Sequence, residues 1–259
     1  MQIGLKVWSI NPVAHRDTAI ELYGQGLCDY VEIYTVPGHS DRIAVWKECP
    51  QKKVIHAPHL SHNFNLADRN LRSSNQKIFR EVQLYADKLH ADIIICHAGT
   101  GGTPDEAVEQ MLDLHDERIV VENKPYWQHA DLLPPGSDLT CRGAVYEEFA
   151  HIAAAFGNRV CHDVTHTVCM ANTLKLDWRQ EIKRFEGFKP LIYHLSDLET
   201  ADDELDSHTA LGQGKLDWQT ALSLIDQDGM LTLETPKISQ EHLDDFANEV
   251  RMIKSRKIY

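Results

Sequence analysis

The chain has 259 residues, of which 42% are hydrophobic, and its formal net charge is −13. This length suits one α/β barrel domain over residues 1–259, and no apolar run reaches the roughly 18 residues that a membrane span needs. The negative charge disfavours binding to nucleic acid or anionic membrane unless a local cationic site overrides it.

Short apolar segments recur along the chain, with longer segments between them. In chain order they are residues 3–10, 29–36, 53–60, 92–99, 118–125, 159–166, 191–198 and 230–236. Residues 71–91 have helical spacing that places Ile78, Val82, Tyr85 and Leu89 on one face. Residues 144–157 predict a helix that ends on Gly157, and residues 239–257 predict a helix with Ser239 as its N-cap.

The order of these segments predicts the fold class. Eight strand candidates alternate with eight helix candidates, of which the one after residues 29–36 is short. This alternation calls for a parallel sheet, most simply closed as a (β/α)8 TIM barrel. An open doubly wound sheet is the weaker alternative, because no GxGxxG sequence follows the first strand.

Six of the eight predicted strands end in a histidine or a carboxylate. In a TIM barrel the active site lies where the strands end, so these side chains should converge on one mouth. Each of them alone is ordinary, but several carboxylates gathered without cations would be costly. We therefore predict a metal site. The strand ends supply His56, His97, Glu122, Asp163, His194 and Glu234, and the adjoining loops supply His166, Asp206 and His208.

The stretch RVCHDVTH, residues 159–166, concentrates four candidate ligands. Strand alternation predicts that Asp163 faces the mouth and that His162 faces the helical layer. Cys161 shares the face of Asp163 one pleat lower, where a small buried core residue is the favoured interpretation. His166 lies beyond the strand and can bend back over the site.

Two further features bear on the compartment. The start MQIGLKVWSI lacks a basic stretch followed by a long apolar one, so we expect an unsecreted, cytoplasmic protein. The six cysteines form no CxxC pair, which indicates reduced and mostly buried thiols.

The motifs VIHAPHL, ICHAGT, VVENKP, HDVTH, YHLSDL, DSHTALGQG and LTLETP resemble, in order, the metal motifs of endonuclease IV (AP endonuclease family 2) in the xylose isomerase-like barrel superfamily. The resemblance spans nearly the whole chain and implies three zinc ions. It assigns His56, His97 and Glu122 to the first metal and makes Glu122 a bridge to the second. Asp163, His194 and Glu234 would complete the second site, and His166, Asp206 and His208 would hold the third.

The resemblance implies a hydrolase that activates water for attack on phosphorus, with no side-chain nucleophile. Glu122 and Glu234 would be the catalytic carboxylates, and Glu122 would orient the attacking water. The mixed histidine and carboxylate set suits Zn²⁺, with Mn²⁺ or Fe²⁺ as alternatives. No organic cofactor is implied.

The chain departs from the endonuclease pattern in its DNA-handling positions. His59 stands where the family has an aromatic residue, and Lys6 stands where it has a histidine. The loop TVPGHSDR lacks the stretch that enters DNA. With the net charge, these departures favour a small phosphorylated or sugar-like substrate over abasic DNA. The oligomeric state is left open.

Two other functional classes stay open. The segment CDYVEIY resembles the second strand of sugar isomerases and epimerases in the same superfamily, with Glu32 at the matching carboxylate. Such a divalent-metal-dependent sugar or sugar-phosphate isomerase would use Glu122, Asp163, His194 and Glu234 around one metal. A metal-bearing barrel without catalysis is the third class. Lys124 can meet a substrate phosphate or neutralise a carboxylate in any of them.

Overall fold

Each of the eight apolar segments forms a strand in the computed structural model, which describes residues 1–255. The strands are β1 (Gln2–Trp8), β2 (Tyr30–Tyr34), β3 (Lys52–His56), β4 (Ile94–His97), β5 (Ile119–Glu122), β6 (Val160–Asp163), β7 (Ile192–Leu195) and β8 (Met230–Leu233). All neighbours pair in parallel, and β1 pairs with β8, so the sheet closes into a barrel. The predicted (β/α)8 fold is confirmed.

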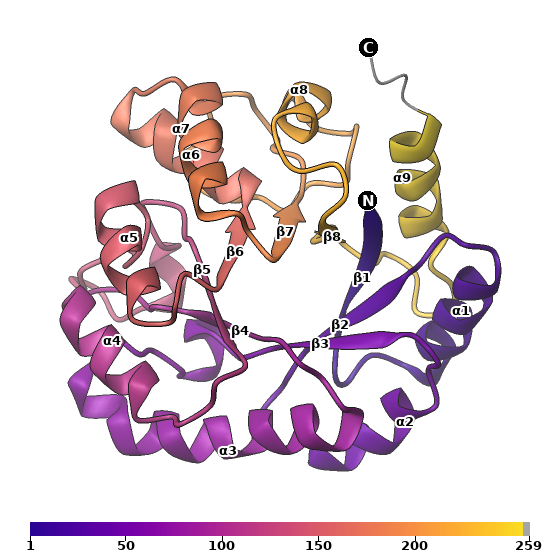
Figure 1. Ribbon diagram of the computed structural model, residues 1–259, viewed down its shortest axis with the longest axis horizontal. Helices are drawn as coiled ribbons and strands as arrows, with labels where there is room; N and C mark the ends of the chain where they lie inside the picture. The colour runs from indigo at the N-terminus through magenta and orange to yellow at the C-terminus, as the bar shows by residue number, and fades with distance from the viewer. Residues whose placement is uncertain (256–259) are drawn as a thin grey trace.

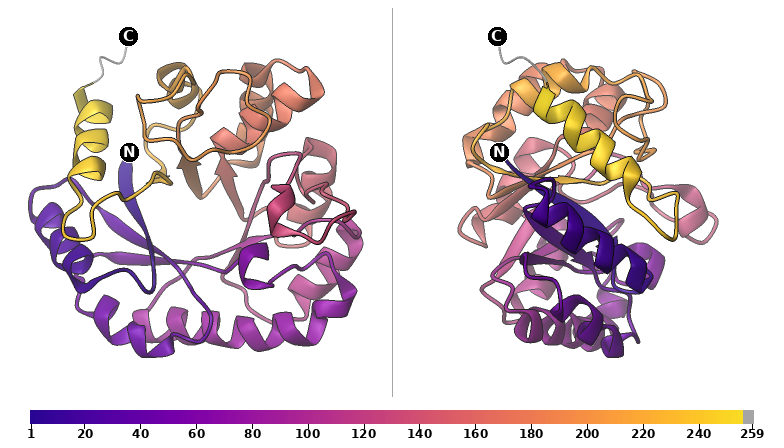
Figure 2. Two further views of the ribbon diagram at one scale, coloured as in Figure 1. Left: turned by 180° about the vertical axis from the view of Figure 1, so that it is seen from behind. Right: turned by 90° about the vertical axis from the view of Figure 1, so that its right-hand side faces the viewer.

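Helices surround this barrel on the outside, as Figures 1 and 2 show. They are α1 (Val13–Gly24), α2 (Ile43–Lys47), α3 (Arg72–Leu89), α4 (Pro104–Leu112), α5 (Tyr146–Ala154), α6 (Val164–Leu174), α7 (Trp178–Phe185), α8 (Trp218–Ser223) and α9 (Asp244–Ser255). Short 3-10 helices lie at Ser40–Arg42, Leu60–His62, Arg69–Leu71, Ala130–Leu132 and Glu186–Phe188. The helix after β2 is short, as predicted, and no helix among the described residues is long and apolar enough to cross a membrane.

Two predicted helix boundaries are wrong. The last helix begins at Asp244, because the Ser239 hydroxyl accepts from the N–H groups of Glu241 and His242 and so closes a separate turn before the helix. Its predicted end at residue 257 lies outside the described residues. The helix before β6 ends at Ala154, and Gly157 follows it in a turn with φ of +62°.

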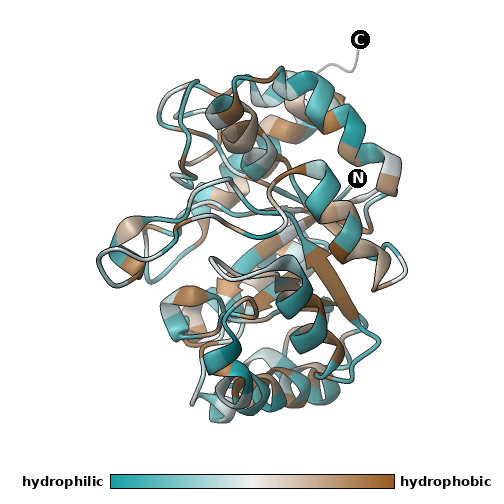
Figure 3. Ribbon diagram, turned by 90° about the vertical axis from the view of Figure 1, so that its left-hand side faces the viewer, coloured by the Kyte–Doolittle hydropathy of each residue, from teal (hydrophilic) through white to brown (hydrophobic). Residues whose placement is uncertain are grey.

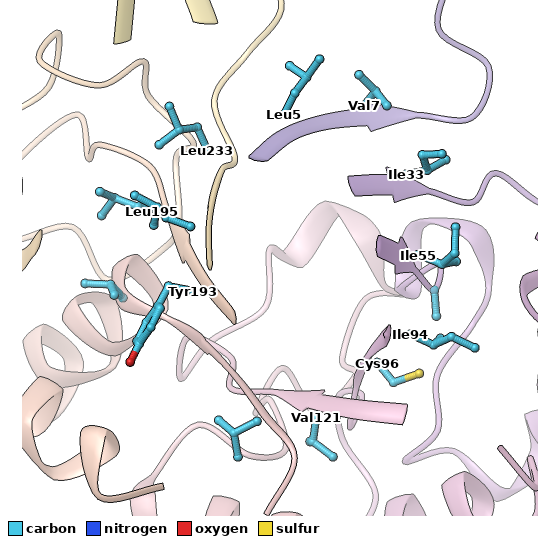
Figure 4. Packing of buried hydrophobic residues seen from close by; sticks show 14 of the residues in the cluster. Leu5, Val7, Ile33, Ile55, Ile94, Cys96, Val121, Tyr193, Leu195 and Leu233 are labelled. Atoms are coloured by element: carbon cyan, nitrogen blue, oxygen red, sulfur yellow. The ribbon is translucent and has the colours of Figure 1, made fainter. Parts of the chain in front are cut away.

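The apolar core lies between the barrel and its helices. Side chains such as Leu5, Ile33 and Val121 point outward from their strands, as Figure 4 shows. Hydropathy colouring shows the same division, with brown on central strands and mixed colours on the surrounding helices (Figure 3). All six cysteines are buried and free, which agrees with the predicted thiols.

A smaller apolar layer fills the barrel itself. It includes Tyr30, Val54, Ile95, Val120, Cys161 and Ile192. Gly4 makes room for the Tyr30 ring, since a Cβ at Gly4 would lie 2.2 Å from a ring carbon. The barrel is thus closed below by packed side chains, among which the Tyr30 hydroxyl pairs with the Thr232 hydroxyl at 2.8 Å, and the charged groups gather at the level above.

Candidate metal centre

Strand alternation brings the predicted ligands to one level of the barrel interior. In β3 to β6, the residue two positions before each terminal ligand belongs to the apolar interior layer: Val54 before His56, Ile95 before His97, Val120 before Glu122 and Cys161 before Asp163. Successive side chains of a strand point to opposite faces, so these terminal ligands must share the inward face. The register places His97 opposite Glu122 and Asp163 opposite His194.

Glu122 lies at the centre of the cluster. Its Oε2 atom lies 3.0 Å from His56 Nε2 and 2.8 Å from His97 Nε2. Its Oε1 atom faces a different pair, at 3.3 Å from His194 Nδ1 and 3.5 Å from His166 Nδ1. One carboxylate therefore faces two separate histidine pairs, which is the arrangement of a bridging ligand.

His194 connects Glu122 to the other side of the mouth. Its Nδ1 lies 2.8 Å from Glu234 Oε1, and its Nε2 lies 2.9 Å from Glu32 Oε2. The Lys6 ammonium contacts both Glu32, at 2.5 Å, and Glu234. Lys6 and Glu32 are also register partners on β1 and β2. The site thus includes a partly buried lysine whose ion pairs neutralise part of the carboxylate charge.

Asp163 and His166 are held by the start of α6. Asp163 is the N-cap of this helix, and its Oδ1 accepts from the His166 N–H at 2.7 Å. The first turn of the helix then brings the His166 ring back over the site, with Nδ1 3.6 Å from Asp163 Oδ2. The sequence predicted that His166 bends back over the site, and the first turn of α6 produces this position.

Asn123, directly after the neighbouring strand β5, holds both residues in place. Its side-chain oxygen accepts from the Asp163 N–H at 2.7 Å, and its amide group donates to the Asp163 carbonyl at 2.9 Å. Its own carbonyl lies 2.8 Å from His166 Nδ1. Sequence reasoning did not assign Asn123 a role, although its place directly after Glu122 was a signal.

The long loop after β7 supplies Asp206 and His208. Asp206 Oδ2 lies 3.2 Å from His166 Nε2 and 3.3 Å from His208 Nε2. His208 Nδ1 also lies 3.9 Å from Glu234 Oε2. All nine predicted ligands therefore belong to one connected cluster.

Asp197 holds this loop in place, and sequence reasoning did not identify it. The fully buried carboxylate accepts from the N–H groups of Leu198, Gly212, Gly214 and Leu216. A Cβ at Gly214 would lie 2.1 Å from the Leu198 carbonyl oxygen. The GQG segment is therefore needed for close packing around Asp197.

The charges in the cluster are strongly coupled. Burial opposes charge on His166, but Asp163 and Asp206 outweigh it and raise the pKa of His166 to about 9. Burial lowers the pKa of His97 to about 3, despite the neighbouring Glu122. Burial likewise opposes ionisation of Glu32, yet His194 and Lys6 lower its pKa to about 2. Basic neighbours also outweigh burial at Glu122, Asp206 and Glu234 and lower the pKa of each, whereas burial raises the pKa of Asp163.

The donor set fits divalent metal ions. Four groups of closely spaced ligand atoms occur among the described residues, including His56 with His97 and Glu122, and Glu122 with Asp163 and His166. Three buried ligand atoms have no hydrogen bond of good geometry with any described residue: Glu122 Oε1, His194 Nδ1 and Asp206 Oδ2. Buried polar atoms require a partner, and ligation to a cation would satisfy them.

A cavity of about 480 Å³ opens above the cluster. Its lining includes the aromatic residues Trp8, Tyr34 and Trp127 and six of the predicted ligands, namely His56, His97, His166, Asp206, His208 and Glu234. Its volume is in the range of small-molecule sites.

Comparisons with known proteins agree with this architecture. The model of the xylose isomerase-like TIM barrel family matches residues 28–256. No curated protein matches by sequence. A D-tagatose 3-epimerase-like protein has a TM-score of 0.70 and 17% identity, with 98% of this chain and 96% of that chain covered. Endonuclease IV from Thermus thermophilus has a TM-score of 0.66 and 19% identity, with 98% of each chain covered. A second protein from Thermus thermophilus, in a crystal soaked with zinc chloride, has a TM-score of 0.63 and 18% identity over both full chains. At these identities the likeness shows the fold.

Proposed function

The chain belongs to the xylose isomerase-like TIM barrel family, and we propose that within it this protein is a metal-dependent phosphoester hydrolase. The observation that carries the proposal is the two-sided contact of Glu122. Its two oxygens face the His56 and His97 pair and the His166 and His194 pair. An enzyme with one metal ion has no need of His56 and His97, nor of Asp206 and His208.

The nine ligands would hold up to three ions, for which Zn²⁺ is the proposed metal and Mn²⁺ or Fe²⁺ the alternatives. Bound ions of this kind lower the pKa of water and stabilise charge on phosphoryl oxygens. Glu122 orients the attacking water molecule from its central position, and Glu234 holds the opposite side of the mouth. Lys6 keeps Glu32 and Glu234 ionised through direct contact.

The substrate of this proposal is a small phosphoester. The cavity of about 480 Å³ accommodates a compact molecule. The net charge of −13 disfavours a polyanionic duplex at the rim.

A sugar or sugar-phosphate isomerase or epimerase is the second candidate. It is favoured by Glu32, which is fully buried beside His194 and Lys6. Glu122 and Glu234 both face His194, at 3.3 and 2.8 Å, and two such carboxylates can exchange a proton with a bound sugar. This mechanism needs one metal, so metal stoichiometry separates the two candidates.

The experiment is elemental analysis of protein purified without chelators, together with assays on bis(4-nitrophenyl) phosphate and on ketose epimerisation. The hydrolase predicts more than one metal ion per chain, loss of metal in His56→Ala and His208→Ala, and phosphodiester cleavage. His151→Ala is the matched control, because this exposed histidine pairs with Asp105 and with no other side chain among residues 1–255. One ion per chain, kept in both ligand variants, would contradict the hydrolase and favour the isomerase or epimerase.

A further inference from the structure

Glu32 is a fully buried carboxylate beside the proposed metal ligands, on a strand that supplies none of them. Its Oε1 accepts from the Lys6 ammonium at 2.5 Å. Its Oε2 accepts from the Thr232 hydroxyl at 2.7 Å and lies 2.9 Å from His194 Nε2. Each oxygen of Glu32 therefore has a donor within the protein.

These contacts argue against Glu32 as a metal ligand. One of its oxygens lies within 4.8 Å of ligand atoms from His56, His194 and Glu234. An ion on Oε1, however, would displace the Lys6 ammonium, and an ion on Oε2 would displace the Thr232 hydroxyl and the His194 ring. Separating a partly buried ammonium group from its carboxylate partner is costly. The role of Glu32 therefore lies in its contact with His194.

A chain of hydroxyl groups fixes the Oε2 atom of Glu32 in the barrel interior. The Tyr30 hydroxyl lies 2.8 Å from Thr232 Oγ1. Because the hydroxyl proton of Thr232 is donated to Glu32, the Tyr30 hydroxyl donates to the Thr232 oxygen. Tyr30 itself belongs to the apolar layer that fills the barrel. The carboxylate is thus anchored from this layer and presents a fixed acceptor to the His194 ring.

This acceptor determines which nitrogen of His194 is free to bind an ion. A carboxylate only accepts hydrogen bonds, so the Nε2 atom that faces Glu32 carries a proton, and in the neutral ring Nδ1 has a free lone pair. Nδ1 lies 2.8 Å from Glu234 Oε1 and 3.3 Å from Glu122 Oε1. It is buried and forms no hydrogen bond of good geometry with any described residue. A lone pair between two carboxylates suits a cation.

We propose that Glu32 is a positioning residue for the proposed metal ligand His194. It holds the ring proton on Nε2 and so directs the Nδ1 lone pair to an ion between Glu122 and Glu234. A carboxylate partner of this kind fixes the ring of a histidine ligand and makes its ligating nitrogen more basic. The inference rests on the proposed function only in that His194 binds a metal ion, and it applies equally to an isomerase or epimerase.

The experiment titrates metal-free protein with Zn²⁺ by calorimetry and counts the bound ions by elemental analysis. Glu32→Gln keeps the shape of the side chain but loses its charge, so one ion should bind about 10–100-fold more weakly while any others are retained. Glu106→Gln is the matched control, because Glu106 is a buried carboxylate on the outer helix α4 that pairs with Arg69 and Arg72. The control should keep the wild-type affinity for every ion.

A double-mutant cycle separates positioning from a purely structural role. If Glu32 acts through His194, Glu32→Gln should have little further effect on zinc affinity in a His194→Gln background. An equal loss of affinity in both backgrounds would show a structural role and overturn the inference. Loss of an ion in Glu32→Gln as complete as that in His194→Gln would make Glu32 a ligand and overturn it as well.

Thr232→Val tests the same contacts while the carboxylate stays in place, and it decides the question if Glu32→Gln does not fold. The substitution removes the donor that fixes Oε2, so the same ion should bind about two- to tenfold more weakly. Wild-type zinc affinity in this variant and in Glu32→Gln would contradict the positioning role.

Nitrogen-15 NMR of the histidine rings reads the tautomer directly in the zinc-loaded wild type. The ring signals that disappear in His194→Gln should show a proton on Nε2 and a metal-bound Nδ1, and binding through Nε2 would overturn the inference. A wild type that binds zinc through His194 but cleaves no phosphodiester would contradict only the hydrolase. A wild type that binds no zinc would contradict both proposals.

Discussion

Asn123 shows how one side chain can position a proposed metal ligand through hydrogen bonds to its backbone. Its amide makes two hydrogen bonds with the backbone of Asp163, and its carbonyl meets His166. Asn123→Leu would leave the buried N–H of Asp163 without its acceptor. We expect a loss of about 1–3 kcal/mol in the free energy of unfolding and about 10–100-fold weaker metal binding. Urea unfolding and metal titration would check both values, and unchanged metal affinity would contradict the orienting role.

The partly buried Lys237 side chain makes the free energy of unfolding depend on pH, and the sign of this dependence follows from its pKa. Burial outweighs the opposing effect of Glu249 and Glu234 and lowers its pKa from 10.5 to about 8 in the folded protein, so between these values the unfolded chain binds more protons. Stability should therefore rise with pH across this window as the cost of the buried charge disappears. Unfolding free energies of wild type and Lys237→Met at about pH 7.5 and 10 would test this. The rise should be smaller in Lys237→Met than in the wild type or in the control Lys88→Met, whose lysine is exposed on α3.

The loop between β7 and α8 is the element that completes the cluster. It has no helix of its own, so its position depends on the four hydrogen bonds that Asp197 accepts. In Asp197→Asn the amide group would face backbone N–H donors, so at least part of this set is lost. We expect a cost on the order of 2–4 kcal/mol and fewer bound metal ions, because Asp206 and His208 lose their position.

Unfolding and elemental analysis would measure both effects of Asp197→Asn. Asp202→Asn is the control, since Asp202 is exposed on the same loop and its one side-chain hydrogen bond among the described residues is with the Thr200 hydroxyl. A destabilised variant that keeps full metal content would show that the loop does not position the ligands.

At the scale of the whole molecule, we expect the carboxylate cluster to couple metal binding to stability. Five carboxylates lie close together at one mouth of the barrel, and Lys6 pairs directly with two of them, Glu32 and Glu234. The other three are Glu122, Asp163 and Asp206. Ions that bind only the folded state stabilise it, and chelation removes that contribution. We expect chelation to lower the melting temperature by at least about 5 °C and metal addition to restore it. An unchanged melting temperature after verified metal removal would contradict metal binding at the cluster.

The amino-acid sequence by itself determined the eight strands, their closure into a barrel and the level at which ligands gather. These follow from local patterns, because the two-residue period of a strand fixes which side chains share a face, and Val54 with His56 or Val120 with Glu122 obey it. Metal occupancy of the nine ligands stays a prediction.

The tertiary structure alone decided which atoms meet. Three sets of contacts join residues that are far apart in sequence: those of the Glu122 carboxylate, the hydrogen bonds of Asn123 and the hydrogen bonds that Asp197 accepts. No local sequence period encodes such distances. The late start of α9 was missed for a similar reason, because Ser239 can cap a turn as readily as a helix.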